Sequence, residues 1–360
     1  MNRNVVIRSL DAHAGRTIII SDIHANLKAY HALLKKVGYR PQIDRLIIDG
    51  DFLEKGHDNL AILHELMRQS QTEDVHCIMG NCDFVCKNAL YSYRLTFLRK
   101  ILLMRPGSVL NEMGAELGLK IKPDTDMAVF CQTIRRHFLA ELAFVNDLPH
   151  VIETPDTIIA HSAIQSPDHY GDDFREVINH SFYLREDLPR FEKRVVVGHM
   201  PVTEYCRRIA SFNPIYDASR NIYSIDGGNV VKSSGQLNAL ILEGNRVSYA
   251  SWDDLPETTV LEDVPAQTVL PFFVNWNEGH VTIRKCEGRQ LYVYNEHLNR
   301  SFWVDEAFYR DHKVSEYTNY QMPLKKGERV KIVFPYGDQV QIKKNGILGW
   351  TYTSSLAFFK

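Results

Sequence analysis

Five short apolar runs in this chain each end at a side chain that can bind a metal ion. The runs span four or five residues, and most are rich in isoleucine and valine, which is typical of strands buried on both faces of a sheet. They end at Asp22-Ile23-His24, Asp49-Gly50-Asp51, Gly80-Asn81-Cys82-Asp83, His161 and Gly198-His199. In open α/β sheets, ligands lie beyond the carboxyl ends of the strands. The series therefore predicts that carboxylate, amide and imidazole groups meet at one rim of one sheet.

The segment around these runs has the pattern of a layered α/β domain over residues 1–255. Between residue 17 and about residue 90, strand patterns alternate with helix patterns, the first helix starting after Asn26 and ending at Gly38. Residues 90–147 look helical throughout, and we expect them to form a cap inserted between the third and fourth site strands. Strand patterns return at 157–164, 194–197, 222–226, 237–242 and 247–252.

The composition changes after residue 256 to alternating strands and turns, with a weak internal repeat. The segment from Val281 to Val293 is echoed by the segment from Val330 to Ile342, at a constant offset of 49 positions. This predicts two small β-barrels in tandem that fold separately from the rest. Residues 256–316 would be a β-rich SH3-like or linker module, and residues 317–360 an SH3-like domain. The second resembles bacterial SH3-like modules through Leu324–Val330 and Lys343–Trp350. Any twisted antiparallel sheet with one Trp per hairpin would give a similar pattern, so that alternative stays open.

Length, charge and cysteine usage narrow the class of protein. A chain of 360 residues is too long for one ordinary core, and a formal charge of −2 does not favour nucleic-acid binding. The six cysteines are scattered through the chain, which indicates reduced thiols and a cytoplasmic protein. No segment resembles a signal peptide, and no run approaches the roughly 20 apolar residues of a membrane span. We therefore expect no membrane partner.

The ordered motif series resembles the calcineurin-like metallophosphoesterases over about residues 15–252. The turn Gly198-His199-Met200-Pro201 and the later Ile225-Asp226-Gly227-Gly228 look most like the phosphoprotein phosphatase branch. The resemblance implies a four-layer sandwich of sheets flanked by helices, two divalent metal ions, and in-line attack on phosphorus by a hydroxide that bridges the metals. Two ions roughly 3.5–4 Å apart can clamp both reacting oxygens of such a displacement. Oxygen and nitrogen ligands suit manganese, iron or zinc.

The resemblance also implies a ligand set, with Asp51 bridging the two ions. The first ion would be held by Asp22, His24 and Asp51. The second would be held by Asp51, Asn81, His161 and His199.

Three positions depart from the phosphoprotein phosphatase pattern. Cys82 stands where that branch has a histidine that protonates the leaving group, Glu54 where it has the aspartate that orients this histidine, and Lys55 where it has a phosphate-binding arginine. A thiol has an unperturbed pKa of about 8.5 and is an unusual acid for this step. Catalytic roles are expected for Asp51, Asn81, Glu54, Cys82 and Asp83, and phosphate binding for Lys55 and Asn81.

Three functions are compatible with this pattern. The first is hydrolysis of phosphate monoesters, on phosphorylated Ser, Thr or Tyr of a protein or on a small aryl phosphate. The second is a phosphodiesterase or nucleotide-phosphate hydrolase, acting on a cyclic nucleotide or dinucleotide, because Gly80-Asn81-Cys82-Asp83 also resembles small microbial phosphodiesterases without the histidine. The third is a weakly active metal-binding module whose tail binds a peptide or protein.

Overall fold

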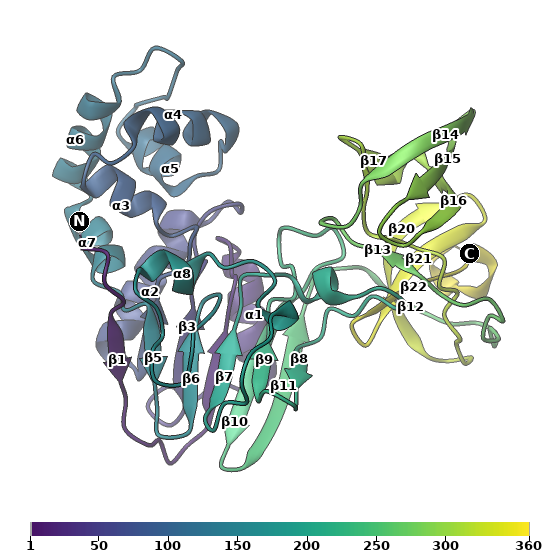
Figure 1. The fold of residues 1–360 in the computed structure, drawn as a ribbon, viewed down its shortest axis with the longest axis horizontal. Coiled ribbons are helices and arrows are strands. Elements are labelled where there is room, and N and C mark those ends of the chain that lie inside the picture. Colours follow the sequence, from purple (N-terminus) through teal and green to yellow (C-terminus); the bar gives the residue numbers. More distant parts are fainter. Residues whose placement is uncertain (1, 360) are drawn as a thin grey trace. The chain divides into compact units, whose positions relative to one another are not determined.

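The computed structural model describes residues 2–359, which divide into two compact units (Figure 1). The first unit runs to Met200 and resumes over Pro214–Asp253. The second consists of Pro201–Asn213 together with the chain from Asp254 onward. The expected boundary at residue 255 lies next to the observed one, but residues 201–213 pack with the C-terminal unit instead of the first. No helix within the described residues is long and apolar enough to cross a membrane.

Two sheets form the centre of the first unit. One has six strands in the order β1 (Ile7–Ser9), β5 (Val151–Glu153), β6 (Thr157–Ala160), β7 (Arg194–Val197), β9 (Ile222–Ser224) and β8 (Ile215–Asp217). The other has five, in the order β11 (Arg246–Trp252), β10 (Leu237–Glu243), β2 (Thr17–Ile20), β3 (Arg45–Asp49) and β4 (Val75–Ile78). Their strands are short, buried and parallel around the site, as the apolar runs predict.

The two sheets pack on each other through alternate residues of these strands. Ile19 and Ile47 of one sheet share a fully buried cluster with Ile159 and Val196 of the other. The intervening residues, such as Ile20, belong to a larger cluster with helix residues. Every second side chain of a strand points to the opposite face, so each strand contributes to both cores. The mixed α/β architecture is therefore confirmed.

Helices surround these sheets. The first two are α1 (Leu27–Val37) and α2 (Asn59–Thr72). Asn26 caps α1 by accepting a hydrogen bond from the backbone N–H of Ala29 at 3.0 Å, and Gly38 ends it with φ of 59°, as predicted. The helical block between β4 and β5 is also confirmed. It contains α3 (Val85–Leu90), α4 (Leu95–Met104), α5 (Val109–Glu116), α6 (Met127–His137) and α7 (Leu139–Asn146), and the short α8 (Phe174–Ile178) follows β6.

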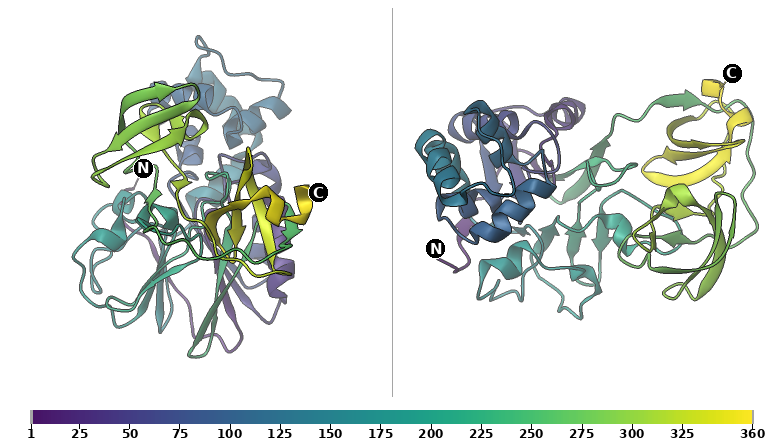
Figure 2. Two further views of the ribbon diagram at one scale, coloured as in Figure 1. Left: turned by 90° about the vertical axis from the view of Figure 1, so that its right-hand side faces the viewer. Right: turned by 90° about the horizontal axis from the view of Figure 1, so that it is seen from above.

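The C-terminal unit is built from small antiparallel sheets. The four-stranded sheet contains β12 (Glu257–Thr259), β20 (Arg329–Tyr336), β21 (Gln339–Lys344) and β22 (Ile347–Tyr352). The three-stranded sheet contains β14 (Val281–Glu287), β15 (Gln290–Asn295) and β16 (Arg300–Asp305). The two-stranded sheets are β13 (Phe273–Val274) with β19 (Tyr317–Thr318), and β17 (Tyr309–Arg310) with β18 (Lys313–Val314). The two larger sheets have separate apolar cores. Figure 2 gives two further views of these strands.

The internal repeat is visible in two hairpins of this unit. The β14–β15 pair shifts register between Ile283 and Lys285, and the β20–β21 pair shifts between Ile332 and Phe334, again 49 positions on. The turns that follow contain Gly288 and Gly337, with φ of 57° and 60°. A bulge and a left-handed glycine at matching positions show that the repeat is structural. Whether each half is an SH3-like barrel stays a prediction.

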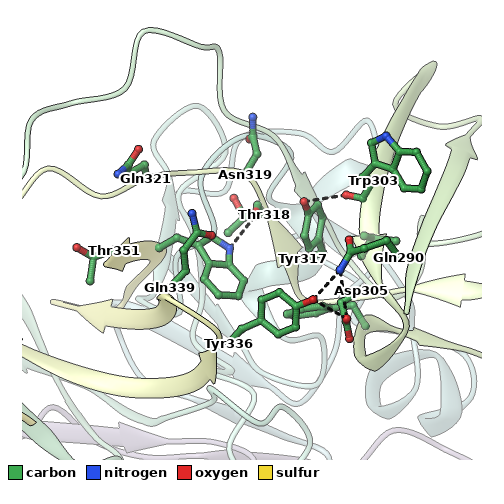
Figure 3. Close-up of a pocket in the computed structure, with 13 residues that line it drawn as sticks. Gln290, Trp303, Asp305, Tyr317, Thr318, Asn319, Gln321, Tyr336, Gln339 and Thr351 are labelled. Atoms are coloured by element: carbon green, nitrogen blue, oxygen red, sulfur yellow. Dashed lines mark hydrogen bonds between the residues drawn. The ribbon is translucent and has the colours of Figure 1, made fainter. Parts of the chain in front are cut away.

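A cavity of about 350 Å³ lies within the C-terminal unit, and aromatic rings line much of it (Figure 3). Tyr336 donates its hydroxyl hydrogen bond to Asp305 at 2.8 Å, and Gln290 donates to the Tyr336 oxygen at 2.6 Å. The indole N–H of Trp350 donates to the carbonyl of Thr318 at 2.8 Å. The polar groups of Gln290, Tyr336 and Trp350 at this cavity thus have hydrogen-bond partners within the unit. That the tail binds a peptide or protein stays a prediction.

Deleting the chain from residue 256 onward should destabilise the protein. Phe212 is fully buried with Phe273 and Leu348, and its N–H donates to the carbonyl of Gly346 at 2.8 Å. Burying a side chain of this size contributes about 1.5–3 kcal/mol, which the truncation would remove. His199 lies two residues before Pro201–Asn213, so metal content should fall as well. Thermal unfolding and metal analysis of the truncated and full chains test this, and unchanged values would show instead that the tail is independent.

Candidate metal centre

The predicted ligands lie in the loops that follow the carboxyl ends of five strands. Asp22 and His24 follow β2, Asp51 follows β3 and Asn81 follows β4, whereas His161 and His199 follow β6 and β7. The expectation of one rim of one sheet is wrong in this respect, since β2, β3 and β4 belong to the five-stranded sheet and β6 and β7 to the six-stranded one. The groups meet because the two sheets are stacked.

The loops carry unusual backbone conformations. Asp22, His24, Asp51 and His199 have φ of 54°, 50°, 49° and 67°, in the left-handed region that non-glycine residues seldom adopt. Strained residues of this kind cluster at functional sites, where the surrounding structure holds them.

Asp51 lies at the centre of one group of donors. Its Oδ1 is 3.3 Å from Nε2 of His161 and accepts a hydrogen bond from the backbone N–H of Cys82 at 2.7 Å. Nδ1 of His161 lies 2.8 Å from the carbonyl oxygen of Asp49, so the proton on that nitrogen leaves Nε2 free to face Asp51. Oδ1 of Asn81 is 3.3 Å from the same Nε2, and the rings of His161 and His199 lie 5.2 Å apart between centroids.

Asp22 and His24 form the other side of the site. Nε2 of His24 is 3.6 Å from Oδ1 of Asp22, and Nζ of Lys55 is 3.1 Å from the same nitrogen. Oδ2 of Asp22 accepts a hydrogen bond from the backbone N–H of His199 at 2.9 Å. Oδ1 of Asp22 is buried and accepts no hydrogen bond. An unpaired buried carboxylate oxygen is costly, and a divalent cation would satisfy it.

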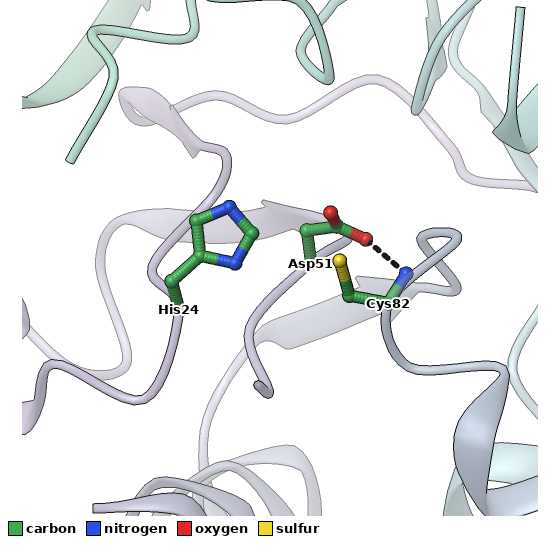
Figure 4. A group of neighbouring side chains, drawn as sticks. All are labelled: His24, Asp51 and Cys82. Carbon is green, nitrogen blue, oxygen red and sulfur yellow. Dashed lines mark hydrogen bonds between the residues drawn. The ribbon is translucent and has the colours of Figure 1, made fainter. Parts of the chain in front are cut away.

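The donor atoms fall into two groups that share Asp51. His24, Asp51 and Cys82 offer ligand atoms within 4.8 Å of one another (Figure 4). Asp51, His161 and His199 do so as well. A carboxylate common to two groups is the arrangement that two neighbouring metal ions require. The donor set therefore fits two ions. The first group also contains Cys82, which the ligand set expected from the sequence does not include.

Burial tunes the ionisation of these groups. Burial, reinforced by the Lys55 ammonium, lowers the pKa of His24 to about 3. Burial, reinforced by His161, lowers the pKa of His199 to about 3. Burial opposes ionisation of Asp51, yet the neighbouring His161 ring holds the pKa of Asp51 well below its usual range. These shifts favour the neutral imidazole at His24 and His199 and the ionised carboxylate at Asp51, the forms that bind metal ions.

Cys82 keeps its proton more tightly than an ordinary thiol. Burial raises the pKa of the Cys82 thiol well above its usual value, and the negative charge of Asp51 adds to this. A weaker acid gives less help to a departing oxygen. The structure therefore does not strengthen the predicted role of Cys82 as proton donor.

Asp83 has a positioning role in this structure. Its side chain is fully buried and accepts three backbone hydrogen bonds, from Asp51 at 2.9 Å, from Gly80 at 2.8 Å and from Leu53 at 3.0 Å. These bonds tie the loop after β3 to the loop after β4. The sequence pattern predicts a catalytic role for Asp83, whereas both of its carboxylate oxygens hold the backbone in this structure.

Replacing Asp83 with alanine should lower the free energy of unfolding by about 3–5 kcal/mol, because three buried N–H groups lose their acceptor and each costs about 1–3 kcal/mol. Urea denaturation measures this directly. Asp124→Ala, at an exposed residue of the helical block, is the matched control and should change stability by less than about 0.5 kcal/mol. Equal stability of the two variants would contradict the positioning role.

Glu54 anchors the helical block to the loop after β3. Its Oε1 accepts hydrogen bonds from the Ser108 hydroxyl at 2.7 Å and from the Val109 N–H at 2.9 Å, at the start of α5. Asn59 strengthens the junction by donating to the carbonyl of Gly107 at 2.8 Å. The predicted role of Glu54 was to orient a proton donor at position 82, whereas the donors to its carboxylate, Ser108 and Val109, belong to the block. This junction places the block beside the site.

Two site residues were not among the sequence predictions. Asp226 is almost fully buried after β9, and its charge raises the pKa of Asp22, second in effect only to burial. Asn229 donates to the carbonyl of Ile23 at 2.7 Å and so holds the loop that carries Asp22. The signal was present, because Ile222–Ser224 is a further strand whose end is followed by an aspartate.

Comparison with known proteins gives one matching family and several solved structures of low sequence identity. The model of the calcineurin-like phosphoesterase family matches residues 15–249. A candidate diadenosine tetraphosphatase has 18% sequence identity, over 69% of this chain and 100% of that one, with a TM-score of 0.46. A cold-active protein-tyrosine phosphatase from a Shewanella species has 15% identity over 69% and 83%, with a TM-score of 0.43. A protein serine/threonine phosphatase from Saccharomyces cerevisiae has 10% identity over 70% and 85%, with a TM-score of 0.41.

No functionally curated protein matches the sequence. The family model nevertheless covers well over half of the chain, including every loop of the metal centre. The chain therefore belongs to the calcineurin-like phosphoesterase family and is a phosphoric ester hydrolase.

Proposed function

We propose that the protein binds two divalent metal ions and hydrolyses phosphate monoesters. Asp22, His24 and Asp51 would hold the first ion, and Asp51, Asn81, His161 and His199 the second. The observation that carries the proposal is the pair of donor groups that share Asp51. The bound ions would supply an activated water and neutralise charge on the phosphoryl group, the largest contributions to this chemistry.

Lys55 supports a monoester in preference to a diester. Its exposed side chain places Nζ 3.1 Å from Nε2 of His24, so a third cationic group lies beside the two proposed metal positions. A phosphate monoester carries about two negative charges at neutral pH, whereas a diester carries one. The additional cation therefore compensates the extra charge of the monoester, as a point charge without the bidentate geometry of arginine.

A phosphodiester remains the second candidate because of Cys82. Its thiol stands where a histidine would protonate the leaving group of a monoester, and the thiol is buried. The small microbial phosphodiesterases that Gly80-Asn81-Cys82-Asp83 resembles also lack this histidine.

Turnover of two aryl esters separates the candidates. The full chain, loaded in turn with manganese, iron or zinc, is assayed with p-nitrophenyl phosphate and with bis(p-nitrophenyl) phosphate. The proposal expects a higher kcat/KM for the monoester and loss of both activities on chelation. A faster diester would establish the second candidate instead, and no turnover of either by the metal-loaded protein would contradict both.

A further inference from the structure

A second cavity, of about 190 Å³, opens beside the metal centre. It lies within the first unit, and one of its lining residues is Asn81, the proposed metal ligand. The remaining walls come from the start of the helical block, from α8 and from the N-terminal segment. The N-terminal segment is joined to α8 by a hydrogen bond from the N–H of Phe174 to the carbonyl of Arg3 at 2.9 Å. A group bound here would be adjacent to a phosphate held at Asn81.

The charged groups of this cavity are all positive. Arg3, Arg94 and Arg175 line it, and none of the described residues that line it carries a carboxylate. Arg175 pairs with Asp173 through Nε at 2.8 Å and Nη2 at 2.5 Å, yet its side chain is 55% exposed and the N–H groups of Nη1 remain available. Arg94 has φ of 52° at the start of α4, and its guanidinium stacks on the ring of Phe97 at 5.0 Å. Guanidinium groups match the geometry of carboxylate and phosphate.

Aromatic rings form the rest of the surface. Phe84 and Phe174 are stacked with centroids 5.6 Å apart, and Tyr93 meets Phe84 edge-on at 6.3 Å. These rings would contact the carbon skeleton that carries an anionic group. The cavity is smaller than the roughly 300–1,000 Å³ of a complete small-molecule site, so it has the size of a subsite.

We propose that this cavity is a specificity subsite for the leaving-group portion of the substrate. It binds an anionic group, a carboxylate or a second phosphate, that the substrate carries beyond the scissile phosphate. The inference rests on the proposed phosphoesterase function and adds a substrate class to it. A guanidinium that bonds such an anion contributes roughly a ten-fold gain in binding or more, since hydrogen bonds to charged groups are among the stronger ones.

Two matched substrate pairs test the subsite. The first pair is 4-(carboxymethyl)phenyl phosphate and its neutral 4-(carbamoylmethyl)phenyl analogue, whose leaving groups are nearly alike. The second pair is 1,4-phenylene bisphosphate and phenyl phosphate. The wild-type protein should prefer the anionic member of at least one pair by about ten-fold in kcat/KM. The pair that shows the preference identifies carboxylate or phosphate as the natural anion.

The variants Arg94→Gln and Arg175→Gln should each remove most of this preference, and the neutral substrate should be affected much less. Arg136→Gln, at an exposed residue of α6 outside the cavity, is the matched control and should retain the preference. Thermal unfolding shows whether each variant is folded. If one of the two is not, Arg3→Gln, at the third arginine of the cavity, is tested in its place.

The outcomes separate this inference from the proposed function. Turnover of phenyl phosphate without any preference in the wild type would overturn the subsite and leave the function intact. A wild-type preference that survives in both arginine variants would overturn it as well. No turnover of any of the four substrates by the metal-loaded wild type would contradict the proposed function itself.

Discussion

Replacing Asp51 with asparagine should lower kcat/KM for p-nitrophenyl phosphate by more than about 10³-fold. The side chain is almost fully buried and belongs to both donor groups of the metal centre, so the substitution removes one negative charge from two metal positions at once. Metal content should fall from two ions toward none, because asparagine offers only one neutral oxygen. Kinetic assay and metal analysis of the same preparation measure both effects.

Asp124→Asn is the matched control, since the same chemical change is made at an exposed residue of the helical block. It should retain both the activity and the metal content of the wild type. Thermal unfolding shows whether Asp51→Asn is folded. A folded Asp51→Asn protein with two ions per chain and full activity would refute the assignment of Asp51 as the bridging ligand.

Aryl phosphates should be hydrolysed far faster than alkyl phosphates. General acid catalysis typically contributes roughly 10²–10⁴-fold, and position 82 holds a buried thiol in place of a histidine. An aryl oxide, whose parent phenol has a pKa near 10, needs little protonation to depart, whereas a serine oxygen needs much. A phosphotyrosine peptide should therefore exceed the matched phosphoserine peptide by about 10²-fold or more in kcat.

The structure also changes what is expected of Cys82→His. A histidine at this position needs a carboxylate to orient its ring, but Oε1 of Glu54 accepts hydrogen bonds from Ser108 and Val109, which hold this carboxylate against the helical block and leave only its buried Oε2 without a hydrogen-bond partner. Cys82→His should therefore raise kcat for the phosphoserine peptide, but by less than the wild-type ratio of kcat between the phosphotyrosine and phosphoserine peptides. Equal kcat for both peptides in the wild type would show that another group supplies the proton, and would disprove the interpretation of Cys82.

Local sequence was sufficient to predict the elements that carry the site. The apolar runs predicted β2, β3, β4, β6 and β7, because a strand buried on both faces needs an uninterrupted series of apolar side chains. The cap residues of α1 were readable for the same local reason, since Asn26 and Gly38 act on the backbone within a few positions of themselves. The repeat in the tail was equally local and reappears as paired bulges at Ile283 and Ile332.

The roles of the surrounding polar residues could not be read in this way. Asp83 follows a metal-ligand motif and was expected to have a catalytic role, whereas its carboxylate holds the N–H groups of Asp51, Gly80 and Leu53, up to 32 positions away. Glu54 similarly bonds to Ser108 and Val109, 54 and 55 positions away. Hydrogen bonds of such separation depend on how the loops pack and leave no periodic signal in the sequence.

The sequence by itself determined the type of each strand, the loop residues that can bind metal and the family to which they point. Only the tertiary structure decided that these loops come from two stacked sheets, and that residues 201–213 belong with the C-terminal unit. It also decided which guanidinium groups lie beside Asn81. The physical reason is that periodicity and capping act over a few residues, whereas the stacking of sheets and the shape of a cavity arise from side chains that meet only after the chain has folded.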